Sequence, residues 1–327
     1  MFASCIPVRG ISRSTICDLP RNKIRFIPND FYDLLVKFED CHIDEILTHY
    51  GTEHKEIITE YFDFLIENEF GFWCDDPDLF PKLNTYWKSA SVIENGIIDV
   101  NNESRHDFEK IFRQYESLGC NALEIRFYEH ISISELFNIL NYLAESRIGS
   151  VDILLRYQEE VSIDDFKEIM NENPRIHSIS IHSTPHEKLK GFNTESNIYF
   201  FETPVTSSTH CGKIGMKYFT VNQDTFFESQ NFNTCLNKKI SIDVNGDIKN
   251  CPSMQGVHGN IKDDLLSDIL QNTNLNQVWS IHKEQIETCK GCEFRHVCTD
   301  CRAFLDSDKS KSKPKKCTYH PVTMEWK

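Results

Sequence analysis

The sequence predicts an α/β protein with three consecutive parts, because three different patterns follow one another along the chain. Residues 1–80 contain short extended segments and then helical stripes of apolar residues, and residues 90–205 alternate strands with helices. Eight of the thirteen cysteines lie in residues 206–327. Alternating strands and helices are typical of a parallel sheet, and closely spaced cysteines are typical of metal binding or of disulfide bonds.

Composition, charge and the N-terminal segment narrow the classes of function. Of the 327 residues, 39% are hydrophobic and 26% are charged, as in ordinary globular proteins. The formal net charge of −15 argues against nucleic acid as a partner, and we interpret the lysine-rich residues 309–316 as a solvated loop. Residues 1–10 lack the apolar core of a signal peptide, and no apolar run has membrane length. We therefore expect a cytoplasmic protein with no membrane partner, whose thiols stay reduced.

Residues 1–80 are expected to form a winged-helix-like module. Apolar residues recur on one helical face in three successive stretches between residues 31 and 66, which predicts three helices. The aromatic segment Phe70–Trp73 is expected to return as a strand and to form the wing. The segments that we expect to be extended, and to build a small sheet, are Cys5–Arg9, Ser14–Asp18 and Lys23–Pro28.

Residues 90–205 are expected to form a parallel sheet from βαβ units. About five strands are too few to close an eight-stranded barrel, so a partial barrel or an open sheet is expected. Three histidines, His130, His177 and His182, lie near strand ends. We single out His130, because Glu129 precedes it at the C-terminal end of a strand, where such folds place their sites. The expected strands are Ile97–Val100, Ala122–Tyr128, Val151–Tyr157, Ile176–His182 and Ile198–Phe201, and the expected helices span residues 105–118, 134–146 and 162–172.

The eight C-terminal cysteines are spaced in a way that suits metal binding. Eight thiolates make two complete sites of four ligands, and each Cys-x-x-Cys pair places two sulfurs on one side of a tight turn. In order, the cysteines are Cys211, then Cys235-x10-Gly246-x4-Cys251, then Cys289-x2-Cys292-x5-Cys298-x2-Cys301, and finally Cys317.

Three kinds of cross-link are compatible with this pattern. Paired zinc knuckles are usually separated by about 15–20 residues, whereas only residues 293–297 separate the two Cys-x-x-Cys turns here. Iron–sulfur sites tolerate such crowding, because a later cysteine of a packed run often ligates a different cluster. Disulfide bonds fit less well with a cytoplasmic location and with an odd number of cysteines. Spacing alone therefore favours iron–sulfur over zinc, and zinc remains the alternative.

A β-hairpin is expected between two of these cysteines. Ile240, Ile242 and Val244 alternate with polar residues up to Asn245–Gly246, and an Asn-Gly pair between alternating apolar residues is a strong hairpin signal. A two-residue loop would pair Val244 with Asp247 and, counting outward, Ile240 with Cys251. The hairpin would thereby carry Cys251 back towards Cys235.

The order and spacing of the eight cysteines resemble those of the SPASM domain, the C-terminal extension of many radical S-adenosylmethionine (SAM) enzymes that modify peptides. The resemblance covers residues 211–327. It implies two auxiliary [4Fe-4S] clusters, carried over to this chain position by position. The first cluster would be held by Cys211, Cys235, Cys251 and Cys301, and the second by Cys289, Cys292, Cys298 and Cys317.

The two preceding parts resemble other modules of the same enzymes. Strands followed by helices in residues 1–80 resemble the PqqD-like recognition element of ribosomally made, modified peptides (RiPPs), which binds the leader of a precursor peptide by strand addition. The middle part resembles a radical SAM partial barrel. Its loop at residues 101–104 contains none of the three cysteines of the SAM cluster, and residues 128–131 replace the Gly-rich SAM motif. We therefore interpret the barrel as degenerate, with no SAM site and no SAM cleavage.

The whole-chain order resembles the grasp-with-spasm maturation proteins, which occur with an ATP-grasp ligase and a short precursor peptide. The resemblance implies a component of peptide maturation that binds the precursor peptide and works with the ligase. Its iron–sulfur clusters would be mainly architectural, because metal binding stabilises a cysteine-rich region with little apolar core. The alternatives are an iron–sulfur or redox enzyme that modifies a peptide without SAM cleavage, and an interaction protein stapled by zinc.

Overall fold

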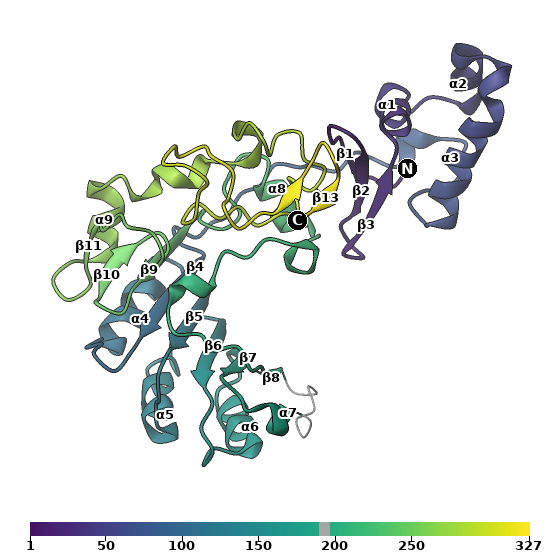
Figure 1. Cartoon of the computed structure of the whole chain (residues 1–327). Coiled ribbons are helices and arrows are strands. Elements are labelled where there is room, and N and C mark those ends of the chain that lie inside the picture. The colour runs from purple at the N-terminus through teal and green to yellow at the C-terminus, as the bar shows by residue number, and fades with distance from the viewer. Residues whose placement is uncertain (190–196) are drawn as a thin grey trace.

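The computed structural model describes residues 1–189 and 197–327, which form a mixed α/β protein. Figure 1 shows a module at the N-terminal end, a large sheet on the other side of the molecule, and the C-terminal, cysteine-rich segments between them. None of the helices in the described residues has both the length and the apolar character that crossing a membrane requires.

Three antiparallel strands and three helices make up the N-terminal module, and every one of them was expected from the sequence. Strand order in the sheet is β1-β2-β3, so β2 lies in its centre. Residues of the sheet, α1 and α3 share a core that includes Ile16, Phe31 and Leu65. The elements are β1 (Cys5–Val8), β2 (Ser14–Asp18), β3 (Lys23–Ile27), α1 (Asn29–Lys37), α2 (Ile43–Tyr50) and α3 (Lys55–Glu67).

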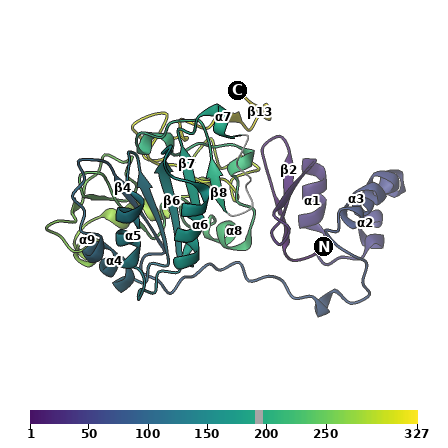
Figure 2. The same cartoon turned by 90° about the horizontal axis from the view of Figure 1, so that it is seen from below.

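The prediction of a wing is wrong, because the segment Phe70–Trp73 is not a strand. Its aromatic side chains pack on other rings instead of forming part of a sheet. The ring centroids of Phe72 and Phe2 lie 5.3 Å apart, and those of Trp73 and Phe62 lie 5.4 Å apart. The chain then continues as an extended linker that runs along the molecule towards the large sheet (Figure 2).

The middle part contains the five strands and three helices that the sequence predicts. Its strands are parallel, and α4, α5 and α6 lie along the sheet (Figure 1). Buried side chains of both layers, such as Ile98, Phe112 and Leu136, form the largest core of the protein. The elements are β4 (Asn95–Val100), α4 (Phe108–Ser117), β5 (Ala122–Phe127), α5 (Ile133–Asn141), β6 (Ser150–Arg156), α6 (Ile163–Glu172), β7 (Ile176–His182), α7 (His186–Leu189) and β8 (Ile198–Phe200).

The large sheet continues into the cysteine-rich part of the chain. Its eight strands have the order β11-β10-β9-β4-β5-β6-β7-β8, and β9 runs parallel to β4. The hydroxyl of Tyr115 in α4 donates a hydrogen bond of 3.1 Å to the carbonyl of Ile240 in β9, which ties the helix layer to the added strand. The C-terminal elements are α8 (Gln223–Glu228), β9 (Lys239–Ile242), β10 (Asp247–Lys249), β11 (Gly259–Asn260), α9 (Leu266–Asn272), β12 (Tyr319–His320) and β13 (Glu325–Trp326).

The hairpin of β9 and β10 forms, but its register differs by one residue from the expected one. Ile242 lies opposite Ile248, so three residues rather than two form the loop. The Asp243 carboxylate accounts for the difference, because it accepts hydrogen bonds from the backbone N–H groups of Asn245 (2.9 Å) and Asp247 (3.0 Å). Gly246, with φ +85°, supplies the left-handed residue that this longer loop needs.

The N-terminal sheet packs against the cysteine-rich part through its second face. Ile16 and Cys17 are consecutive in β2, so their side chains point to opposite faces of the sheet. Ile16 belongs to the core of the N-terminal module, whereas Cys17 shares a core with Phe294 and Cys298. The first and last parts of the chain are therefore joined by a common core.

Replacing Gly96 by alanine is expected to destabilise the large sheet. A Cβ atom at this position of β4 would lie 2.5 Å from Cε1 of Tyr115 and 2.9 Å from Cδ2 of Leu123. Overpacking of this kind costs about 1–3 kcal/mol, to be measured by urea unfolding. The control is Gly256→Ala, whose Cβ would meet its nearest atom, in His258, at 3.9 Å. Equal stability of the two variants would contradict the close packing of β4 on α4.

Candidate metal centre

Four of the C-terminal cysteines gather beside the start of β9, and we call them the first group. Cys235 precedes β9 and Cys251 follows β10, so the hairpin brings their chain segments together. A Cβ atom at Gly212 would lie 2.7 Å from the sulfur of Cys301, which places the residue after Cys211 against that thiol. Burial, together with the charges of Cys251, Cys211 and Cys301, raises the pKa of the Cys235 thiol to about 12, against the opposing charge of Lys239.

The other four cysteines, Cys289, Cys292, Cys298 and Cys317, form the second group. Burial and the charges of Cys317 and Cys289 raise the pKa of the Cys298 thiol to about 11, although the nearby Lys283 opposes this effect. Burial also raises the pKa of Cys292, and the charges of Cys298 and Cys289 contribute in the same direction. Each member of the group is therefore close enough to another member for their charges to interact.

The remaining cysteines belong to neither group, and all thirteen are free thiols. Cys5, Cys17 and Cys120 are buried in apolar surroundings, and Cys41 and Cys74 are exposed.

The donor set of both groups is one that iron–sulfur clusters take. Thiolate is the ligand that iron–sulfur clusters require, and each group supplies four. A single zinc ion would need its sulfur ligands at about 2.3 Å. Within residues 1–189 and 197–327, no three His, Cys, Asp or Glu side chains are arranged to hold one metal ion.

A lysine accompanies the thiols of each group, and sequence inspection missed both lysines. Lys239 begins β9, and the charges of Cys235, Cys251 and Cys211 act on its ammonium group. Lys283 is 4% exposed and acts in the same way on Cys298 and Cys289. In the sequence, Lys239 and Lys283 could have been noticed only as lysines that stand a few residues from a cysteine.

The lysine-rich residues 309–316 are only partly solvated, which corrects the prediction that they form a solvated loop. Lys309, Lys311 and Lys315 are exposed, as expected. The ammonium group of Lys316, by contrast, donates hydrogen bonds of 2.5 Å to the backbone carbonyls of Thr209 and Cys211. Lys316 therefore fastens the segment before Cys317 in the second group to the backbone at Cys211 in the first.

Comparison with protein families agrees with this donor chemistry. Residues 234–293 match the model of SPASM, an iron-sulfur cluster-binding domain. This chain contains a SPASM domain. The matched range includes Cys235, Cys251, Cys289 and Cys292, so it draws two cysteines from each group. No curated protein matches the chain.

The SPASM domain binds iron–sulfur clusters, and the residues present fit such a cofactor. Four of the eight cysteines are buried and three are partly buried, and the cations Lys239 and Lys283 lie beside them. When bound, a cluster supplies metal cross-links and an electron-accepting centre. The chain supplies the thiolates, excludes water by burial, and offsets part of the negative charge with its lysines.

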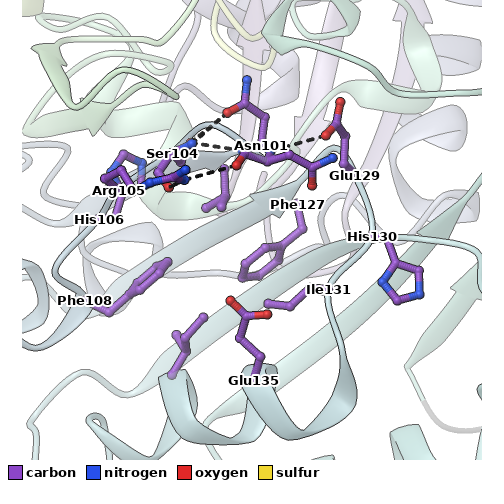
Figure 3. A pocket seen from close by; sticks show the side chains of 13 residues that line it. Asn101, Ser104, Arg105, His106, Phe108, Phe127, Glu129, His130, Ile131 and Glu135 are labelled. Atoms are coloured by element: carbon purple, nitrogen blue, oxygen red, sulfur yellow. Dashed lines mark hydrogen bonds between the residues drawn. The ribbon is translucent and has the colours of Figure 1, made fainter.

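A separate pocket of about 440 Å³ lies at the C-terminal ends of β4 and β5 (Figure 3). The two loops that were expected to mark the degenerate site, residues 101–104 and 128–131, contribute to its wall, and no cysteine lines it. The carboxylate of Glu129 accepts a hydrogen bond of 3.2 Å from the backbone N–H of Asn102. Nε2 of His130 and the carboxylate of Glu160 lie 3.0 Å apart, within hydrogen-bond distance, and both side chains are exposed. The predicted pair Glu129–His130 thus occurs at this pocket, while His177 and His182 do not line it.

Replacing Cys292 by serine is expected to remove the iron bound by the second group, because one of its four thiolates is lost. The melting temperature should fall as well, since metal binding contributes to folding. Iron and sulfide per chain, measured after anaerobic purification, give the result. Cys41→Ser is the matched control, because Cys41 is exposed and lies in neither group. Iron content equal to that of the control would contradict the assignment.

Glu228 is expected to make stability depend on pH. Burial raises the pKa of its carboxyl, which accepts a hydrogen bond from Asn237 (2.9 Å), to about 7. A raised pKa favours folding at low pH, and this contribution is lost as the pH rises through 7. Glu228→Gln should therefore melt at a higher temperature than the parent protein at pH 8, with a smaller difference at pH 5. Glu287→Gln is the exposed control; the same pH profile for both variants would refute the burial of Glu228.

Proposed function

We propose that this protein is a component of RiPP maturation that binds the precursor peptide and works with an ATP-grasp ligase. In this proposal the N-terminal part is a PqqD-like recognition element and the middle part a degenerate radical SAM partial barrel. The two groups of cysteines hold two [4Fe-4S] clusters. The SPASM domain supports the iron–sulfur part of the proposal, and the absence of cysteines around residues 101–104 supports a role other than SAM cleavage.

The free edge of the N-terminal sheet is the observation that carries the proposal. Within the described residues, β3 pairs with β2 alone, so its outer backbone groups have no partner strand. The side chains of Lys23, Arg25 and Phe26 on this strand are exposed. An exposed edge of this kind accepts an extended peptide as an additional strand, with main-chain hydrogen bonds providing affinity.

A rigid connection between this sheet and the second group supports an architectural role for the clusters. Glu293, which follows Cys292, is 1% exposed and forms an ion pair of 2.8 Å with Arg13. Its backbone carbonyl accepts a hydrogen bond of 3.1 Å from the hydroxyl of Thr15 in β2. The Ile11 N–H also donates to the carbonyl of Gly291 at 2.8 Å, within the Cys-x-x-Cys turn. A metal core at this turn would hold the recognition sheet in place.

A second candidate function is an iron–sulfur enzyme that modifies the peptide without SAM cleavage. The pocket at β4 and β5 favours it, because Glu129 and His106 offer a carboxylate and an imidazole there. Burial lowers the pKa of His106 and keeps its ring neutral. Turnover of the precursor peptide by this chain alone, under reducing conditions, would distinguish this candidate from a binding component.

Precursor binding is expected to protect the backbone amides of β3 from hydrogen exchange. The full chain, purified anaerobically, would be mixed with a synthetic peptide that has the leader sequence of a RiPP precursor. We expect slower exchange at residues 23–27 and unchanged exchange in α2, which serves as the internal control. A leader peptide with N-methylated backbone amides should bind more weakly, because strand addition needs those donors. Absence of binding, or binding that leaves β3 unprotected, would contradict the proposal.

A further inference from the structure

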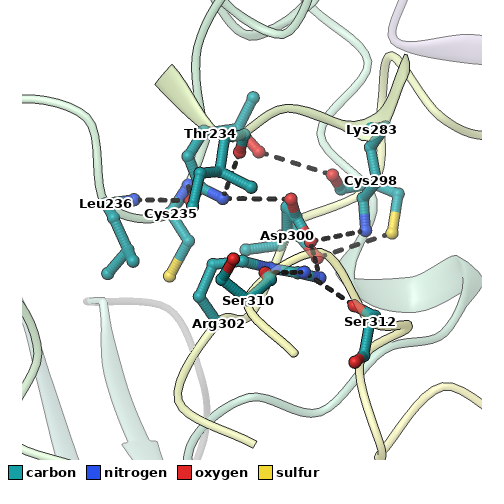
Figure 4. Close-up of polar contacts among 12 residues, drawn as sticks. Thr234, Cys235, Leu236, Lys283, Cys298, Asp300, Arg302, Ser310 and Ser312 are labelled. Atoms are coloured by element: carbon teal, nitrogen blue, oxygen red, sulfur yellow. Dashed lines mark hydrogen bonds and ion pairs between the residues drawn. The ribbon is translucent and has the colours of Figure 1, made fainter. Parts of the chain in front are cut away.

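A buried network of charges lies beside the second group of cysteines (Figure 4). Asp300, between Cys298 and Cys301 in the sequence, is 1% exposed. Its carboxylate forms an ion pair of 3.0 Å with the ammonium group of Lys283 and a second ion pair with Arg302. Arg302 is 5% exposed, and its guanidinium also donates to the carbonyl of Ser312 at 2.7 Å.

The same carboxylate reaches the chain that carries the first group. The side-chain amide of Asn233 donates a hydrogen bond of 3.0 Å to Asp300. The amide oxygen of Asn233 accepts hydrogen bonds from the backbone N–H groups of Cys235 (3.1 Å) and Leu236 (2.9 Å). Asp300 is thus a buried carboxylate that connects Lys283, at the second group, with the turn at Cys235, in the first.

The charges of this network do not balance by themselves. Two buried cations, Lys283 and Arg302, face one carboxylate, so the network carries a net positive charge. Burying uncompensated charge is costly. Although burial alone would lower it, the pKa of Lys283 is raised by the charges of Cys298, Asp300 and Cys289. Lys283 is therefore a charged group beside Cys298 (Figure 4), and an anionic partner there would balance the remaining positive charge.

We propose that Lys283 is the counter-ion of the iron–sulfur cluster held by the second group, and that Asp300 is the residue that positions it. The inference rests on the iron–sulfur part of the proposed function and is independent of peptide binding. A cluster ligated by four thiolates is anionic, and its reduction adds a further negative charge. A fixed buried cation stabilises the reduced form more than the oxidised form, and net charge near a cluster is one determinant of its reduction potential.

The direction in which each substitution shifts the reduction potential follows from the charge that remains beside the cluster. Lys283→Met removes the cation and should lower the reduction potential of the second cluster. Lys283→Arg keeps the charge and should leave the potential near that of the parent protein. Asp300→Asn leaves both cations without their carboxylate and should raise the potential. Lys290→Met is the matched control, because Lys290 follows Cys289 but has a side chain that is 51% exposed.

The test uses the full chain, reconstituted anaerobically with iron and sulfide. Potentiometric titration followed by electron paramagnetic resonance measures the potential of each cluster. For Lys283→Met we expect at least a tenfold lower ratio of reduced to oxidised second cluster at a fixed potential, which corresponds to about 59 mV for one electron. Equal shifts in Lys283→Met and Lys290→Met, or an unchanged potential in Asp300→Asn, would overturn the proposal.

Iron retention provides a second measurement if Lys283→Met fails to hold the cluster. Retention of iron in Lys283→Arg and loss in Lys283→Met supports a role for the charge. Equal loss in both variants shows that the shape of lysine is required and overturns the counter-ion assignment, as does a parent protein that assembles no second cluster. Protection of β3 by the leader peptide is measured on the same samples, so failure of peptide binding is recognised separately.

Discussion

The convergence of thiols from distant segments is the constraint on which the rest of the structure depends. Cys211 and Cys317 stand at opposite ends of the cysteine-rich part, and much of the chain between them is loop. Loops lose conformational entropy on folding without burying much apolar surface in return. Several thiols of both groups are buried nevertheless. Iron–sulfur binding by the SPASM domain supplies the cross-links that such a region needs.

The rest of the chain is fastened to this region from two sides. Strand β9, which leads out of the first group, extends the parallel sheet of the middle part through β4. On the other side, the N-terminal strands share a core with Phe294 and Val297 of the second group's loop, and Arg13 pairs with the buried Glu293. A change that destabilises the cysteine-rich part should therefore destabilise both the large sheet and the free edge of β3.

The regular elements could be predicted from the sequence, whereas side-chain chemistry at particular turns could not. Alternation and helical periodicity located the strands from β1 to β8 and the helices between them except α7, which has only four residues. The predicted hairpin register is off by one residue because the Asp243 carboxylate accepts hydrogen bonds from the loop backbone. The predicted strand Phe70–Trp73 does not form, and the rings of Phe72 and Trp73 pack at tilted angles on Phe2 and Phe62. Cysteine spacing indicated the metal-binding part, but nothing in a linear pattern identifies Asp300 as the partner of Asn233, which lies far before it in the sequence.

Anomalous diffraction at the iron absorption edge, from crystals of the anaerobically purified full chain, tests the central claim most directly. Two separate iron peaks are expected. One should lie among Cys211, Cys235, Cys251 and Cys301, and the other among Cys289, Cys292, Cys298 and Cys317. Anomalous signal at the zinc edge instead, or sulfur–sulfur bonds within either group, would contradict the claim.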